Sequence, residues 1–124
     1  ASVALSADGS LMAVGATGDA SVGKGVGASA TAQAGMDENG AAFVFGLDWK
    51  SGYYVKASNT LSSTAGLWPG IRPDFGQAVS LSADGKRLAV GAPGEYGNAR
   101  GVHTGDDSAG ADRSQPGAGA VYVY

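Results

Sequence analysis

The sequence has 124 residues, a length that suits one domain, and 22 of them are glycine, against a usual share of about 7%. The formal net charge is −3 and the eight basic residues are scattered, which argues against nucleic acid, because neutralising phosphates needs clustered Lys and Arg. No apolar run approaches the roughly 20 residues of a membrane helix, so membrane insertion is not expected, and the absence of cysteine excludes disulfides and thiol chemistry. Because it starts at Ala1 without a signal peptide, the chain is expected to be a mature or excised segment.

Two stretches of the chain are nearly identical. Val3–Ala20 aligns with Val79–Tyr96, with 11 of 18 positions identical, and Gly40–Phe45 matches Gly119–Tyr124. The offset grows from 76 to 79 residues between the two matches, so the second copy has a connection three residues longer, which indicates a surface loop. The chain therefore contains two copies of one supersecondary unit, each too small to bury a core alone.

The expected elements are all strands. The first strand of each copy alternates apolar with small or polar residues, and the second is a short continuous apolar run typical of a strand covered on both faces. The third alternates aromatic and aliphatic residues with high β-propensity. No apolar stripe of helical period develops anywhere, so the predicted class is all-β. In chain order we expect strands at Ser2–Ser6, Leu11–Ala16, Ala41–Phe45, Tyr53–Leu61, Phe75–Ser82, Arg87–Ala92 and Ala120–Tyr124.

The first two strands of each copy are joined by Ser-Ala-Asp-Gly. This sequence predicts a hairpin turn, with Gly9 and Gly85 at positive φ and with Asp8 and Asp84 bonded to their own backbone. The turn accounts for both aspartates without a metal or catalytic role. Leu81, Leu88 and Val90 are expected to take the places of Leu5, Met12 and Val14 in the core.

Four short antiparallel strands per copy, covered on both faces, are typical of a β-propeller blade. The alternative is a seven-stranded β-sandwich, which matches the strand count but gives no reason for the repeat.

The second copy resembles the FG-GAP repeat, the blade of integrin-α-type β-propellers, and is most similar to bacterial secreted members of that family. Phe75-Gly76 matches the FG, and Gly91-Ala92-Pro93 matches the GAP; "YVKASNT" at Tyr54–Thr60 and "GAVYVY" at Gly119–Tyr124 extend the match over nearly the whole chain. The first copy departs from the pattern, since Thr17 replaces the proline and its FG would precede Ser2.

The resemblance implies about one and three-quarter blades. Residues 1–61 would form the first blade, 62–74 a connecting loop, and 75–124 a second blade lacking its last strand. Since propellers have about 4–8 blades, we expect the segment to belong to a longer propeller chain or, as the alternative, to a homo-oligomeric ring.

Calcium is the cofactor that the resemblance raises, because FG-GAP propellers often bind it through a D-x-D-x-D-G loop. That motif is absent, and its nearest approximations are "TGDDSAGAD", with Asp106, Asp107 and Asp112, and "MDENG" at residues 36–40. Neither has the alternating spacing that directs several carboxylates at one cation, so solvated loops are favoured and no cofactor is expected. Thermal melts with Ca²⁺ and with a chelator should then coincide, and an Asp106→Ala or Asp112→Ala change should leave them unaltered.

The remaining candidates are single residues. His103 is the only histidine and cannot form a zinc site or catalytic constellation alone. The glycines of "VGKGVG" at residues 22–27 lack the following G-K-[ST] of a phosphate loop. Trp49 and Trp68 could stack on a sugar, although packing between blades is the favoured role for such large side chains.

The sequence therefore favours a non-catalytic binding or adhesion module, secreted or at the cell surface. The long connections Thr17–Asn39 and Pro93–Ala118 would recognise a protein, since loops on a rigid scaffold are where binding usually lies. The alternatives are a carbohydrate-binding, lectin-like propeller and the scaffold of a secreted hydrolase.

Overall fold

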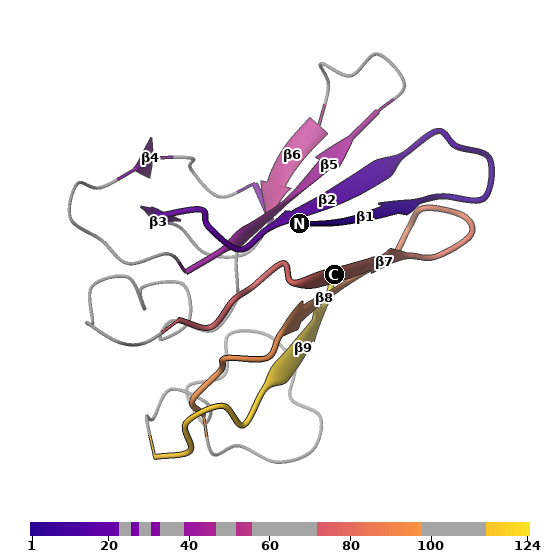
Figure 1. Ribbon diagram of the computed structural model, residues 1–124. Helices are drawn as coiled ribbons and strands as arrows, with labels where there is room; N and C mark the ends of the chain where they lie inside the picture. The colour runs from indigo at the N-terminus through magenta and orange to yellow at the C-terminus, as the bar shows by residue number, and fades with distance from the viewer. Residues whose placement is uncertain (23–25, 28–30, 33–38, 47–51, 56–71, 98–113) are drawn as a thin grey trace.

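The computed structural model describes residues 1–22, 26–27, 31–32, 39–46, 52–55, 72–97 and 114–124. Within these residues the chain is all-β, as predicted, and contains no helix. The strands form an antiparallel sheet of order β1-β2-β5-β6, an antiparallel sheet of order β7-β8-β9, and a short β3-β4 pair (Figure 1). Their bounds are β1 Ser2–Leu5, β2 Met12–Ala16, β3 Ser21–Val22, β4 Thr31–Ala32, β5 Ala41–Phe45, β6 Gly52–Val55, β7 Ala78–Leu81, β8 Leu88–Ala92 and β9 Ala120–Val123.

All seven predicted strands are present, with shifts of one to three residues at seven of their fourteen ends. The largest shift is at β7, where Phe75 forms only an isolated bridge with Gly40 before the strand begins at Ala78. The strand predicted at Tyr53–Leu61 is β6, and residues 56–61 lie outside the described part. The short strands β3 and β4 were not predicted, because two-residue strands leave no alternation to detect.

The two larger sheets repeat the same strand pairing. Val3 pairs with Val14 in the first sheet, and Val79 pairs with Val90, 76 residues later, in the second. Val14 in turn pairs with Phe43, as Val90 does with Tyr122. The repeat in the sequence is therefore a repeat of three strands in one register.

The hairpin turns agree with the prediction in detail. Gly9 and Gly85 both have φ of 71°. The Asp8 carboxylate accepts hydrogen bonds from Ser6 Oγ at 2.9 Å and from the Ser10 backbone N–H at 2.9 Å. In the second turn, the Asp84 carboxylate accepts the equivalent bonds at 2.6 and 3.0 Å. Each carboxylate thus bonds to the backbone of its own hairpin turn, as the sequence predicted.

Each sheet has one face of small and one face of large side chains, because paired residues of neighbouring strands point to the same side. In the first sheet, the small-residue face comprises Ser2, Ala4, Ala13, Gly15, Ala42 and Val44, and the large-residue face Val3, Leu5, Met12, Val14, Phe43 and Phe45. The same positions of the second sheet form a small-residue face of Ala78, Ser80, Ala89, Gly91, Val121 and Val123, and a large-residue face of Val79, Leu81, Leu88, Val90, Tyr122 and Tyr124.

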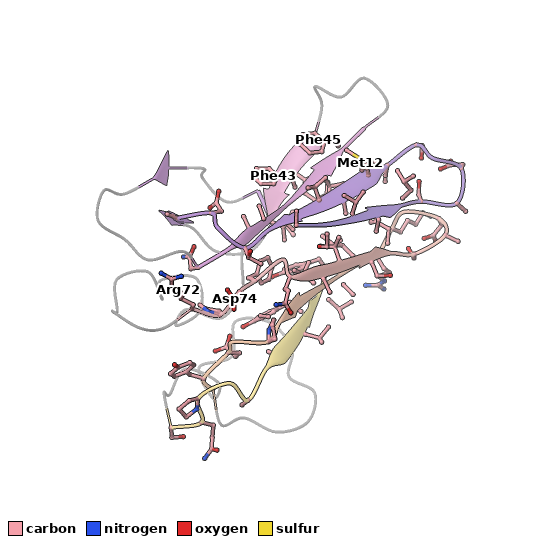
Figure 2. The ribbon with its side chains drawn as sticks, viewed as in Figure 1. Met12, Phe43, Phe45, Arg72 and Asp74 are labelled. Atoms are coloured by element: carbon pink, nitrogen blue, oxygen red, sulfur yellow. The ribbon has the colours of Figure 1, made fainter. Side chains whose placement is uncertain are left out.

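The two larger sheets pack face to back, that is, the small-residue face of the first sheet contacts the large-residue face of the second. The buried core combines small-residue positions of the first sheet, such as Ala13 and Val44, with large-residue positions of the second, such as Leu88 and Val90. Figure 1 shows β7 lying beside β1 and β2, and Figure 2 shows Met12, Phe43 and Phe45 on the side of the first sheet away from β7–β9. The large-residue face of the first sheet and the small-residue face of the second therefore both point outward.

This packing corrects two expectations. The residues expected to be equivalent in the two copies have equivalent positions in the strand pairing, but they are not equally buried. Leu5 is 58% exposed and Met12 and Val14 are half-buried, whereas Leu88 is 2% and Val90 0% exposed. The central strands were also expected to be covered on both faces, yet β2 and β8 each bury one face only. The physical reason is that, among the described residues, the two larger sheets pack on each other, the first through its small-residue face and the second through its large-residue face.

Phe75 and Gly76 lie between the two larger sheets. The Phe75 side chain is fully buried, and its ring meets those of Tyr122 and Tyr124 edge-on at centroid distances of 5.4 and 6.4 Å. Gly76, at φ 94°, passes so close to Gly15 and the Ala41 carbonyl that a Cβ would collide with backbone atoms. The Phe75-Gly76 pair thus lies in the space between the two larger sheets.

Candidate functional site

The two long connections leave the same end of the molecule. The hairpins that join β1 to β2 and β7 to β8 lie side by side at one end, and the connections after β2 and β8 leave from the opposite end (Figure 1). The hairpins are joined directly, since the Ala7 N–H donates to the Ala83 carbonyl at 3.0 Å. We call the opposite end the loop end, and define it by residues 17–20, 39–40, 72–77, 93–97 and 114–119.

Both connections are closed by the same hydrogen bonds at their bases. The Gly40 N–H donates to the Asp19 carbonyl at 2.9 Å, and the Gly119 N–H to the Glu95 carbonyl at 3.2 Å. Both glycines have positive φ, 85° and 78°, which directs the chain back into β5 and β9. In the second connection, the Gln115 N–H also donates to the Tyr96 carbonyl at 3.1 Å, and this bond holds the two ends of the connection together. The ends of each long loop are therefore held together by the fold.

The base of the second connection contains a buried carboxylate. Glu95 is 5% exposed, and its side chain accepts hydrogen bonds from the Tyr122 hydroxyl at 2.9 Å and from the Tyr96 N–H at 3.2 Å. The equivalent positions of the first copy are Asp19 and Phe43, so this side-chain pair belongs to the second copy alone. It connects the loop base to an aromatic ring that touches Phe75.

The segment before β7 links the two loop bases. Pro73 is buried, and its carbonyl accepts the Gly94 N–H at 3.0 Å. Two residues later, Phe75 bridges to Gly40 at the base of the first connection. Asp74 between them has φ 54°, and its carbonyl accepts the Gln77 N–H at 3.1 Å. The bases of the two connections are thus linked to each other through residues 73–75.

The aspartates at the other end have a structural role. The Ser10 backbone N–H, with the Ser10 and Ser6 hydroxyls, lowers the pKa of Asp8 from 3.8 to about 2. The Ser82 hydroxyl and the Lys86 N–H likewise lower the pKa of Asp84. Donors from the turn therefore hold both groups as carboxylates, and this accounts for their conservation of position between the two copies.

The residues singled out from the sequence fall mostly outside the described part. These are Asp106, Asp107 and Asp112 as metal candidates, Trp49 and Trp68 as ligand candidates, and His103. Asn39, the described residue of "MDENG" beside Gly40, is 1% exposed, and its N–H donates to the Asp19 carbonyl at 3.1 Å. Within the described residues no group of three or more His, Cys, Asp or Glu is placed to hold a metal ion.

Sequence reasoning missed the buried Glu95. The signal was available, because an acidic residue follows the second strand by three positions in both copies, as Asp19 and Glu95. The pairing with Tyr122 could not be foreseen, since the two residues are 27 positions apart and meet only once β8 and β9 pair.

Comparison with known proteins gives no relative. No protein-family model, no curated protein and no solved structure matches the chain. Across the ranges that the structure describes, no helix is long and apolar enough to cross a membrane.

Proposed function

We propose that the chain is a non-catalytic binding module, a segment of an integrin-α-like β-propeller whose two long connections recognise a protein. The observation that carries the proposal is the loop end, where two connections of unlike sequence leave from bases that residues 73–75 link to each other. Loops that vary on a constant scaffold are the usual location of binding residues. A secreted or cell-surface location is part of the same proposal.

The stacking of the sheets supports the blade interpretation over the sandwich. In a two-sheet sandwich the inner faces of both sheets form the core and both outer faces meet solvent. Here the small-residue face is buried in the first sheet and exposed in the second. Val44 is 1% exposed, whereas its equivalent Val123 is 67% exposed. In a propeller, each blade packs one face against the preceding blade and the other against the following one. Both outward faces here carry apolar residues, as such packing requires.

The charge of the loops indicates the chemistry of the partner. Residues 17–39 and 93–118 contain seven acidic and three basic residues, whereas the rest of the chain has four acidic and five basic. One of the seven, Glu95, is buried at the loop base. The remaining acidic excess favours a partner with a basic surface, which such loops would attract at low ionic strength.

A loop deletion tests the proposal. Residues 98–113 would be replaced by Gly-Ser-Gly, which the bond between Tyr96 and Gln115 allows because it already brings the ends together. The wild-type chain should bind one or more members of an array of purified cell-surface and matrix proteins, more weakly at high salt, and the deletion should abolish that binding. An Asp8→Asn variant, altered at the opposite end, is the control and should bind as the wild type does.

Two results would contradict protein recognition by the loops. One is protein binding that the deletion leaves unchanged. The other is binding to a glycan array that is lost in Trp49→Ala or Trp68→Ala, which would support the carbohydrate-binding alternative.

A further inference from the structure

The outward face of the first sheet is a large apolar surface. Val3 is 62% and Leu5 58% exposed, and next to them lie Met12, Val14 and the stacked rings of Phe43 and Phe45, whose centroids are 6.2 Å apart (Figure 2). No residue of this large-residue face is charged. A contiguous exposed surface of this composition marks an interaction site in a folded protein.

The outward face of the second sheet is its counterpart. It consists of the small residues Ala78, Ser80, Ala89 and Gly91 next to Val121 and Val123, which are 71% and 67% exposed. It too has no charged residue. Among the described residues, each copy of the chain therefore presents one outward apolar face of each kind.

The packing inside the chain shows how these faces fit. There, the small-residue face of one repeat covers the large-residue face of the other, and the covered positions Leu88 and Val90 are almost fully buried. The outward faces present the same positions of the same repeat in the same register, with the roles of the two sheets exchanged. Apart from the Phe75-Gly76 pair, which has no counterpart before Ser2, the internal interface is thus a template for an external one.

We propose that the large-residue face of the first sheet binds the small-residue face of the second sheet of another copy of this chain. The interaction is head to tail, so a dimer still has one free face of each kind, and association continues until a ring closes or a chain of copies grows. This inference does not depend on recognition by the loops, which lie on the end of the sheets and not on their faces.

Two lysine variants test the proposal, one on each face. Leu5→Lys blocks the large-residue face and Val121→Lys the small-residue face. Both positions are more than half exposed in the single chain, so folding is expected to persist, as circular dichroism will show. Gln115→Lys, at an exposed position of the loop end, adds the same charge on neither face and is the matched control.

Sedimentation velocity over a range of concentrations gives the measurement. The wild type and Gln115→Lys should form species larger than a dimer. Each face variant alone should be monomeric, with a dissociation constant raised at least about tenfold, because a lysine would be buried without a partner. An equimolar mixture of the two face variants should form dimers and nothing larger, since one large-residue face and one small-residue face remain intact.

Three results would overturn the proposal. They are a wild type that stays monomeric throughout, a Val121→Lys variant that dimerises alone through two large-residue faces, and a mixture that stays monomeric. A second pair, Val3→Lys and Val123→Lys, provides the same comparison if either first variant fails to fold. Loss of self-association with unchanged protein binding by the loops would refute this inference and leave the proposed function intact.

Discussion

Val44 and Val123 provide a matched test of the face-to-back packing. They are the same residue type at equivalent positions of the repeat, yet Val44 is 1% exposed and Val123 is 67% exposed. Truncation to alanine removes two methyl groups, each worth about 0.8 kcal/mol when buried. Val44→Ala should therefore reduce the free energy of unfolding by about 1.6 kcal/mol, with an added contribution from the cavity. Val123→Ala, already two-thirds exposed, should cost only about 0.5 kcal/mol.

Urea-induced unfolding measures both values, at a concentration at which the chain is monomeric. The dependence of the free energy on urea should be unchanged in both variants, since neither alters the area exposed on unfolding appreciably. Equal losses for the two variants, or a larger loss for Val123→Ala, would refute the assignment of opposite faces to the core.

Three further predictions concern the turns and the loop base. Gly9→Ala and Gly85→Ala should each cost about 1–2 kcal/mol in urea unfolding, because both place a Cβ at a φ of 71°; unchanged stability in either variant would contradict the turn assignment. Tyr122→Phe should reduce the unfolding free energy by about 1–3 kcal/mol, because it removes a hydrogen-bond donor from the buried Glu95 side chain, and a change below about 0.5 kcal/mol would show that this bond is unimportant. Asp8 has a lower pKa in the folded chain, so its contribution to stability is complete above about pH 4 and is lost as the pH falls towards 2. Unfolding curves at several pH values should therefore show a smaller loss of unfolding free energy in Asp8→Asn than in the wild type. Parallel losses in the two proteins would contradict the stabilising role of the Asp8 carboxylate in the turn.

The sequence was most informative where the structure is local. The Ser-x-Asp-Gly hairpins, the positive φ of Gly9 and Gly85, and the order of the strands follow from residues that are close in the chain. Their causes are turn chemistry and β-propensity, which act over a few positions.

The faces that form the core could not be predicted in the same way. Leu5 and Leu81 have nearly identical neighbours in sequence, yet one is exposed and the other half-buried, because only the arrangement of the two sheets distinguishes them. The same is true of the Glu95–Tyr122 pair, which depends on the pairing of β8 with β9. The metal candidates Asp106, Asp107 and Asp112 and the ligand candidates Trp49 and Trp68 remain predictions.

The face-to-back arrangement makes the fold extensible. A duplicated repeat can be added at either face without changing any existing interface, whereas a sandwich whose inner faces meet is complete with two sheets. Stability in such an array grows by nearly equal increments, each the sum of one repeat and one contact with its neighbour. The outermost repeats of such an array, having one neighbour instead of two, are then the first to open, and amide hydrogen exchange should be faster in them than in repeats covered on both faces.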